Sequence, residues 1–152
     1  MPSSVSVIIP AYNAADRVAR AINRALAQTL PVLEIIVVDD GSADDTVQVA
    51  SSFGSPVRVV SKPNGGPASA RNLGASLARG EWLAMLDADD WWFPRKNEIQ
   101  LAYIAGEENV GLTHCRLDHR TERPPDELGF QDLWERNWIS NSSVLMPRAV
   151  FE

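Results

Sequence analysis

Apolar and polar positions along the first 105 residues predict strands and helices in turn. Apolar runs rich in β-branched residues predict buried strands at residues 5–9, 33–38, 57–60 and 82–86. Apolar residues at helical spacing predict helices at residues 13–30, 44–53 and 68–79, and another that begins at Pro94. This alternation predicts an α/β fold in which a mostly parallel sheet is flanked by helices.

Capping residues and apolar spacing set the expected limits of these helices. Asn13 is expected to cap the first helix, with Asp16 in its first turn. The buried face of this helix is expected to carry Val18, Ile22, Leu26 and Leu30. Pro67 suits the first position of the third helix, and Gly80 suits the residue that stops it. The fourth helix is expected to carry the apolar residues Ile99, Leu101, Ala102 and Ile104.

The pattern is looser after Gly106. Residues 110–117 and 141–146 are each expected to form a strand, and the intervening residues 118–129 are polar. Pro147 is expected to begin a helix that the end of the chain would interrupt after one turn. The sequence therefore suggests a chain truncated at its C-terminus.

Composition argues against several classes of protein. The net charge is −6 and the basic residues form no stripe, so a nucleic-acid partner is not expected. The single cysteine, Cys115, has no internal disulfide partner, and two histidines are too few for a Cys/His zinc site. The apolar run at residues 5–9 lacks the basic start of a signal peptide, and no window approaches the roughly 20 apolar residues of a membrane span. We expect a cytoplasmic chain whose sequence encodes no membrane association and does not indicate an oligomeric state.

Three polar loops follow predicted strands, at residues 10–13, 39–42 and 87–90. Ligands of such folds bind outside the carboxyl ends of the strands, so these loops are expected to converge. Carboxylates at alternate positions past a strand can face one Mg²⁺ or Mn²⁺, which prefers oxygen ligands and leaves positions open for phosphate. Asp89 is the expected metal ligand. Asp87 is expected to help by contact with the metal or a ribose, whereas Asp90 is expected to cap the next turn.

Four segments resemble family-2 glycosyltransferases, which have the GT-A fold. They are residues 5–13, residues 34–42 with Asp45-Thr46, residues 64–67 with 70–72, and residues 80–82 leading into 86–90. The resemblance covers about residues 4 to 96 and identifies the N-terminal, donor-binding portion of such an enzyme. It implies a metal-assisted, inverting transfer of a sugar from a nucleoside-diphosphate sugar, with a UDP-sugar favoured, to a hydroxyl of a saccharide or other acceptor. The implied cofactor is Mn²⁺ or Mg²⁺.

The resemblance also implies a domain division and roles for single residues. Residues 1–105 would bind the nucleotide sugar, and residues 106–152 would begin an incomplete acceptor-side region. Pro10, Ala11 and Tyr12 would line the nucleoside pocket, Asp40 would recognise the base and Asp89 would bind the metal. Asp39, Asp87 and Ala88 complete the expected nucleotide contacts, together with Arg71.

Each of these roles has a simpler structural alternative. Tyr12 could pack at a strand end, and Asp39 could cap a turn. Arg71 follows a Gly-rich loop and could reach a diphosphate, although a surface salt bridge is also open to it. Lys62 is expected to be solvated. Four tryptophans could face an acceptor sugar but are expected to serve the core: Trp91, Trp92, Trp134 and Trp138.

No catalytic residue is identified in the sequence. Inverting members of the family use a carboxylate as general base, which we expect beyond Glu152. Four earlier acids lie too early in the chain for that role: Glu122, Asp126, Glu127 and Asp132. We therefore expect donor binding with little or no transfer, and the alternative is a non-catalytic nucleotide-binding or interaction module of the same fold. Nucleotidyltransferases and dinucleotide-dependent oxidoreductases carry a Gly-rich phosphate loop after the first strand. Residues 10–13 follow the first strand here and contain no glycine, so neither class of enzyme is expected.

Overall fold

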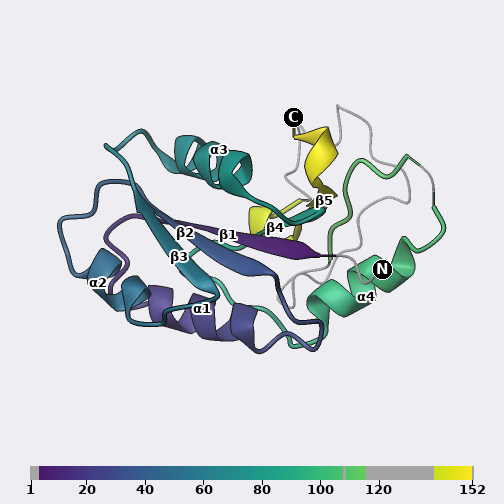
Figure 1. Cartoon of the computed structure of the whole chain (residues 1–152), viewed down its shortest axis with the longest axis horizontal. Helices are drawn as coiled ribbons and strands as arrows, with labels where there is room; N and C mark the ends of the chain where they lie inside the picture. The colour runs from purple at the N-terminus through teal and green to yellow at the C-terminus, as the bar shows by residue number, and fades with distance from the viewer. Residues whose placement is uncertain (1–3, 108, 116–138, 152) are drawn as a thin grey trace.

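The computed structural model describes residues 4–107, 109–115 and 139–151, and within them it forms one five-stranded sheet with helices on both faces (Figure 1). The strands are β1 (Val5–Ala11), β2 (Glu34–Asp39), β3 (Val57–Ser61), β4 (Trp82–Met85) and β5 (Leu145–Pro147). They lie in the order β3-β2-β1-β4-β5. β1 pairs in parallel with β2 and β4, β2 pairs in parallel with β3, and β5 runs antiparallel to β4. The predicted α/β fold with a mostly parallel sheet is confirmed.

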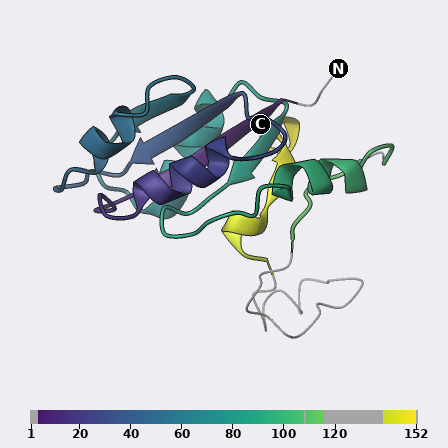
Figure 2. The same cartoon turned by 90° about the horizontal axis from the view of Figure 1, so that it is seen from below.

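The helices cover the two faces of this sheet unequally. They are α1 (Val18–Leu26), α2 (Thr46–Ser51), α3 (Pro67–Leu77) and α4 (Lys96–Tyr103), with short 3-10 turns η1 (Asn141–Ser143) and η2 (Arg148–Val150). α1 and α2 lie on one face and α3 lies on the other (Figure 1). The view from below places α1 across the sheet and α4 beyond its edge (Figure 2). None of the helices in the described part of the chain is long and apolar enough to cross a membrane.

Two apolar layers, one on each face of the sheet, pack between the sheet and its helices. Alternate residues of β1 and β2 point to opposite faces, because successive side chains of a strand do so. Val7 and Ile35 pack in the layer shared with α1, whereas Ile8 and Ile36 pack in the layer shared with α3. All four side chains are fully buried. Burial on both faces explains why these strands are continuous apolar runs, as parallel strands commonly are.

The predicted start of the first helix is wrong. α1 begins at Val18, with Arg17 at the N-cap position and no acidic residue in its first turn. Asn13 has a φ of +45°, which places it in a turn before the helix. Leu26 is exposed, and the buried face carries Val18, Ala21, Ile22 and Ala25. Val18 and Ile22 of the predicted face are therefore confirmed, and the small residues Ala21 and Ala25 complete the buried face.

Two other helices are shorter than predicted. α2 is confined to Thr46–Ser51, and α3 ends at Leu77, before the predicted end at residue 79. Pro67 does occupy the first turn of α3, as predicted. Proline suits this position because the first N–H groups of a helix have no partner within it.

Together with its C-cap residue, α4 buries polar side chains as well as an apolar one. Ile99 is 54% exposed, whereas Lys96, Asn97 and Gln100 are buried. Polar partners on neighbouring elements explain the difference, since the Gln100 Nε2 donates to the carbonyl of Ser143 at 3.0 Å. Tertiary hydrogen bonds thus outweigh apolar periodicity in this helix. Burial of Lys96, whose Nζ lies 4.2 Å from the centre of the Trp92 ring, lowers the pKa of this amine to about 8.

The C-terminal part differs from the predicted pair of strands. Within residues 109–115 the structure has only an isolated bridge, between Thr113 and Leu145. Residues 141–146 divide into η1 and the start of β5, and Pro147 precedes the 3-10 turn η2 where a helix was expected. Trp92 is buried, as expected of a core residue, whereas Trp91 is 42% exposed. Predictions on residues 116–138 and on Glu152 lie outside the described residues.

A buried carboxylate ties the sheet together at the end where β2 begins. Glu34 accepts hydrogen bonds from the hydroxyl of Ser6 at 2.8 Å and from the backbone N–H of Arg79 at 2.7 Å, and it pairs with the Arg79 guanidinium at 3.0 Å. Burial alone would raise the pKa of Glu34, but the hydrogen bonds from Arg79 and Ser6 outweigh it, so the pKa falls below the usual 4.5. This network stabilises the fold far from the carboxyl ends of the strands.

The lowered pKa of Glu34 predicts a loss of stability in acid. A carboxyl group whose pKa is lower in the folded state stabilises the protein above its unfolded pKa, and that contribution disappears as the pH falls through the folded pKa. Glu34→Gln should therefore lower the free energy of unfolding by about 1–3 kcal/mol at pH 7, and by less near pH 3. Urea unfolding of both proteins from pH 7 to pH 3 measures this difference. If the difference in free energy of unfolding between the two proteins did not change with pH, the lowered pKa of Glu34 would be contradicted.

Candidate active site

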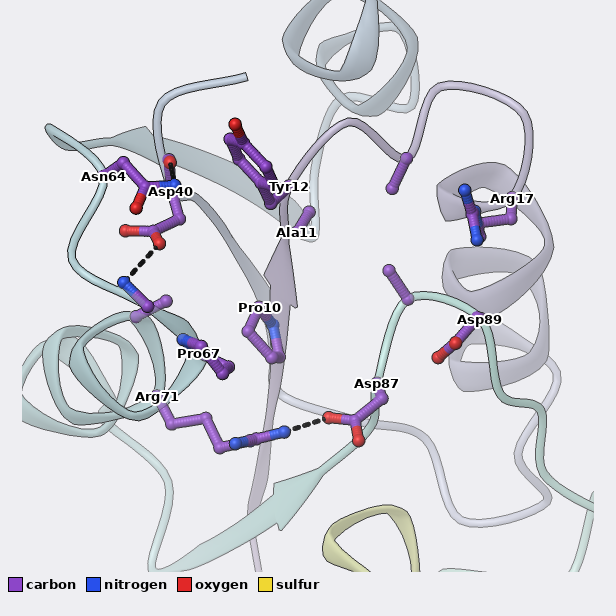
Figure 3. Close-up of a pocket in the computed structure, with 14 residues that line it drawn as sticks. Pro10, Ala11, Tyr12, Arg17, Asp40, Asn64, Pro67, Arg71, Asp87 and Asp89 are labelled. Atoms are coloured by element: carbon purple, nitrogen blue, oxygen red, sulfur yellow. Dashed lines mark hydrogen bonds and ion pairs between the residues drawn. The ribbon is translucent and has the colours of Figure 1, made fainter.

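The carboxyl ends of β1, β2 and β4 open into a pocket of roughly 490 Å³ (Figure 3). This volume lies in the range of sites for small ligands. The lining residues come from four loops and from the starts of α1 and α3: Pro10, Ala11, Tyr12, Ala14, Arg17, Asp40, Asn64, Gly66, Pro67, Ala70, Arg71, Asp87, Ala88 and Asp89. The three loops expected to converge therefore meet at one place.

Asp40 is the most enclosed acidic group of the pocket. Its side chain is 4% exposed, and Oδ1 lies 2.6 Å from Nζ of Lys62. The backbone N–H of Gly65 donates to Oδ1 at 3.0 Å, and that of Gly66 donates to Oδ2 at 2.7 Å. The hydrogen bond from Lys62, followed by those from the two glycines, holds the pKa of Asp40 below its usual value. Asp40 is therefore ionised at neutral pH and fixed in orientation.

The prediction that Lys62 is solvated is wrong. It was expected to be solvated, but its side chain is only 17% exposed and its amine is bound to Asp40. The parallel pairing of β2 with β3 explains the contact, because it sets Ser61 beside Asp39 and so brings the next residue of each strand together. A single sequence does not reveal this pairing between strands.

Gly66 shapes the loop that carries these donors to Asp40. Its φ of +87° lies in a region that residues with a side chain rarely adopt, and it directly precedes Pro67 at the start of α3. The turn aims the N–H of Gly66 at Asp40. Asn64, in the same loop, lines the pocket and donates through Nδ2 to the backbone carbonyl of Asp40 at 3.0 Å.

Arg71 and Asp87 form an ion pair across the floor of the pocket (Figure 3). Nη2 of Arg71 lies 2.6 Å from Oδ1 of Asp87, and the two side chains are 18% and 29% exposed. Nε of Arg71 is buried and has no hydrogen-bond partner among the described residues. The salt bridge considered for Arg71 does form, but inside the pocket, and it leaves the buried Nε without a partner among the described residues.

Asp89 belongs to the same loop as Asp87, at residues 87–90, and lies on the side of the pocket away from Arg71 (Figure 3). Its side chain points into the pocket (Figure 3) and makes no hydrogen bond or ion pair with the described residues. Its backbone is held, because Nη2 of Arg20 donates to the Asp89 carbonyl at 2.7 Å. The N–H of Asp87 likewise donates to the hydroxyl of Ser142 at 2.9 Å. The loop is thus supported from α1 and from η1, while the Asp89 carboxylate stays free.

Tyr12 lies at the opposite end of the pocket from Asp89 (Figure 3). The residue is 55% exposed, so packing at the end of β1 covers less than half of it. The loop that carries it is fixed by Asn13, whose N–H donates to the hydroxyl of Ser42 and whose Oδ1 accepts from the N–H of Ala43, both at 2.9 Å. Asn13 therefore joins two loops of the site, which is why it is unavailable as a helix cap.

Asp39 is the one predicted contact residue that does not line the pocket. It is 3% exposed, and its Oδ1 accepts from the N–H of Ser42 at 3.3 Å. This is the turn-capping arrangement that was the alternative for Asp39. All other predicted residues of the nucleotide and metal sites reach the pocket.

Several lining residues were not predicted, and the sequence signals for them differ. Asn64 and Gly66 belong to the Gly-rich segment at residues 64–67, whose turn chemistry could have indicated a ligand loop. Arg17 directly precedes α1, whose predicted start lies several residues too early, so the direction of its side chain could not be inferred.

The oxygen ligands of the pocket suit a divalent cation shared with a phosphate group. No cluster of three or more His, Cys, Asp or Glu side chains is placed to hold a metal within residues 4–107, 109–115 and 139–151. Mg²⁺ and Mn²⁺ are often held by one or two carboxylates, with substrate phosphates and water completing the shell. Asp89 offers such a carboxylate without an existing partner, whereas Asp87 is already paired with Arg71. The residues present therefore fit a metal bound mainly through Asp89.

Comparisons with known proteins agree with this geometry. The model of glycosyl transferase family 2 matches residues 6–146. Chondroitin synthase from Pasteurella multocida (strain Pm70) is 44% identical over 113 residues, which cover 72% of this chain and 12% of that protein.

Two solved structures share the fold. S. aureus TarS 1-349 in complex with UDP-GlcNAc is 27% identical, with a TM-score of 0.67, over 80% of this chain and 37% of that one. Mannosyltransferase PcManGT from Pyrobaculum calidifontis, in complex with GDP-Man and Mn²⁺, has a TM-score of 0.75 at 22% identity, over 98% of this chain and 46% of that one. The chain thus spans less than half the length of each of these three proteins. Because the family model matches nearly the whole sequence and the sheet matches these transferases, the chain belongs to glycosyl transferase family 2 and has the GT-A fold.

Proposed function

We propose that this chain binds the nucleoside-diphosphate sugar of a metal-assisted glycosyltransferase. The observation that carries the proposal is a single pocket that combines an aromatic ring and a fixed carboxylate at one end with a free carboxylate at the other. A nucleotide sugar offers a base and ribose to the first end and a metal-bound diphosphate to the second. The 27% identity to TarS, whose structure is a complex with UDP-GlcNAc, favours a UDP-sugar as the donor.

The base would lie between Tyr12, Asn64 and Asp40. The exposed Tyr12 ring supplies a flat apolar face for stacking. The carboxylate of Asp40 has about four lone-pair sites, and Lys62, Gly65 and Gly66 donate to it, so little acceptor capacity remains for an imide N–H of a pyrimidine base. The restriction favours a ligand that presents one N–H in a fixed direction. Pro10 and Ala11 would form the apolar wall beneath the nucleoside.

The diphosphate would extend from Arg71 towards Asp89. The buried Nε of Arg71 lacks a partner, and a phosphate oxygen is a suitable acceptor for it. Asp87, paired with Arg71, would face the ribose and orient that guanidinium. Mn²⁺ or Mg²⁺, held by Asp89, would supply a Lewis acid that stabilises charge on the leaving phosphate. Arg20 would keep Asp89 in place through its hold on the backbone carbonyl.

Transfer with inversion to a hydroxyl of a saccharide or other acceptor completes the proposal. Inversion requires a carboxylate that removes the proton of the acceptor, and we place that general base outside residues 1–152. Residues 1–105 would then be the donor-binding region, and residues 106–152 would begin the acceptor side. The whole reaction is assigned to the longer protein, and donor binding to this chain.

Calorimetry with UDP, in the presence and absence of Mn²⁺, tests the proposal. We expect a dissociation constant in the micromolar to millimolar range with Mn²⁺ and binding at least tenfold weaker after EDTA treatment. GDP in the same experiment reports the preference for the base. Absence of UDP and GDP binding under every condition would contradict the proposal and favour an interaction module that only retains the fold.

A further inference from the structure

Two charged side chains that line the pocket are not held by a short, largely buried ion pair. Asp40 is bound to Lys62, and Asp87 is bound to Arg71, each at 2.6 Å. Among the described lining residues, this leaves the carboxylate of Asp89 and the guanidinium of Arg17. Asp89 is the proposed metal ligand, whereas Arg17 has no role in the nucleotide contacts described above.

Arg17 is held only loosely in the structure. Its Nε lies 2.9 Å from Oδ1 of Asp16, and the two side chains are 45% and 75% exposed. Exposed ion pairs of this kind contribute little, typically below about 1 kcal/mol, because water screens them. Its terminal nitrogens have no partner among the described residues. A ligand with a stronger anionic group can therefore recruit the Arg17 guanidinium at small cost.

The position of Arg17 indicates which phosphate group of the donor it would contact. Arg17 and Asp89 lie on one side of the pocket, Tyr12, Asp40 and Asn64 lie on the other, and the Arg71–Asp87 pair lies along the floor (Figure 3). A nucleotide whose base lies beside Asp40 has its phosphates nearer to Asp89, and the phosphate that is further from the ribose comes closest to Arg17. Arg71 is then placed nearer to the first phosphate.

Resting on the proposed function, we propose that Arg17 binds the distal phosphate of the nucleoside diphosphate. A guanidinium offers two parallel N–H donors to the oxygens of a phosphate, so it recognises that group by geometry as well as by charge. The chain as a whole carries a net charge of −6, so the charge of an anionic donor must be offset locally, by a metal ion or by cations placed within the site. Arg17 supplies one such cation on the wall opposite Arg71.

The ratio of UDP affinity to UMP affinity tests this role, because the two nucleotides differ by the distal phosphate. In Mn²⁺, Arg17→Gln should weaken UDP binding about tenfold, as expected for loss of a charged hydrogen bond. It should change UMP binding by less than about twofold. Asp16→Asn, which removes the competing carboxylate, should leave UDP affinity equal to the wild type or higher. Arg95→Gln controls for the loss of one positive charge, since Arg95 is exposed, pairs with Glu98 and lies outside the lining.

The outcomes separate this inference from the proposed function. If the wild-type chain binds UDP and the ratio of UDP affinity to UMP affinity is the same in Arg17→Gln as in the wild type, the role of Arg17 alone is overturned. An equal loss of both nucleotides in Arg17→Gln would also overturn it, because the residue would then not distinguish the distal phosphate. A wild-type chain that binds neither nucleotide would overturn the proposed function and this inference with it.

Discussion

Asp89→Asn is expected to weaken the binding of UDP in the presence of Mn²⁺ by about 100-fold or more. Loss of a residue that merely orients a metal ligand typically costs 10- to 100-fold in metal affinity, and a direct ligand should cost at least as much. The side chain of Asp89 makes no hydrogen bond or ion pair with the described residues, so the substitution should leave the free energy of unfolding within about 0.5 kcal/mol of the wild type. Calorimetry with UDP and Mn²⁺ measures the first effect, and urea unfolding measures the second.

Asp90→Asn is the matched control for this experiment. It makes the same change of charge one residue away, and Asp90 does not line the pocket. We expect its UDP affinity in Mn²⁺ to stay within about threefold of the wild type, since only long-range electrostatics changes. Equal losses in the two variants would mean that the net charge of the loop, rather than a metal ligand, controls binding.

Gly80→Ala is expected to lower the free energy of unfolding by about 3 kcal/mol, the upper end of the usual cost of overpacking. A Cβ at Gly80 would lie 2.7 Å from the backbone N of Ser6 and 2.9 Å from the carbonyl oxygen of Ser4. These are backbone atoms that cannot rotate away, and β1 is the central strand of the sheet. The N–H of Gly80 also donates to the hydroxyl of Ser6, which in turn donates to Glu34. The close approach therefore affects both the strand pairing and the buried network of Glu34.

Gly111→Ala provides the comparison for Gly80→Ala. A Cβ at Gly111 would meet no atom within 4 Å, and its backbone needs no positive φ. This substitution should change stability by less than about 0.5 kcal/mol. Urea unfolding of both variants at pH 7 decides between the outcomes, and similar losses in the two would contradict the packing argument for Gly80.

Apolar periodicity predicts the four parallel strands, but it predicts the buried faces of the helices only in part. Strands β1 and β2 are buried on both sides, so their continuous runs of valine and isoleucine identify them in the sequence. Helices α1 and α4 behave differently. α1 buries two alanines beside the expected Val18 and Ile22, and α4 buries Lys96 and Gln100 because hydrogen-bond partners lie on other elements. Those partners come from distant parts of the chain and leave no local signal.

The candidate site divides in the same way. Loops that follow parallel strands meet at one edge of a sheet, so the convergence of residues 10–12, Asp40 and residues 87–89 could be predicted from the order of elements. The hydrogen-bond and ion-pair partners of each carboxylate could not be predicted in this way. Asp40 accepts from Lys62 and two glycine N–H groups, Asp87 is paired with Arg71, and Asp89 is the carboxylate of the pocket without a partner in the described part of the chain. Strand register and the course of the Gly-rich loop determine these pairings.

The most direct test of the account is to locate the bound nucleotide on the chain. Backbone amide NMR spectra recorded during a titration with UDP and Mg²⁺ report which residues sense the ligand. We predict the largest shifts at the amides of Tyr12, Asp40, Gly66 and Asp89, and little change at Ile99 on α4. Shifts centred on α4, or shifts at Tyr12 and Asp40 that are identical without Mg²⁺ and do not extend to Asp89, would contradict a metal-dependent donor site in this pocket.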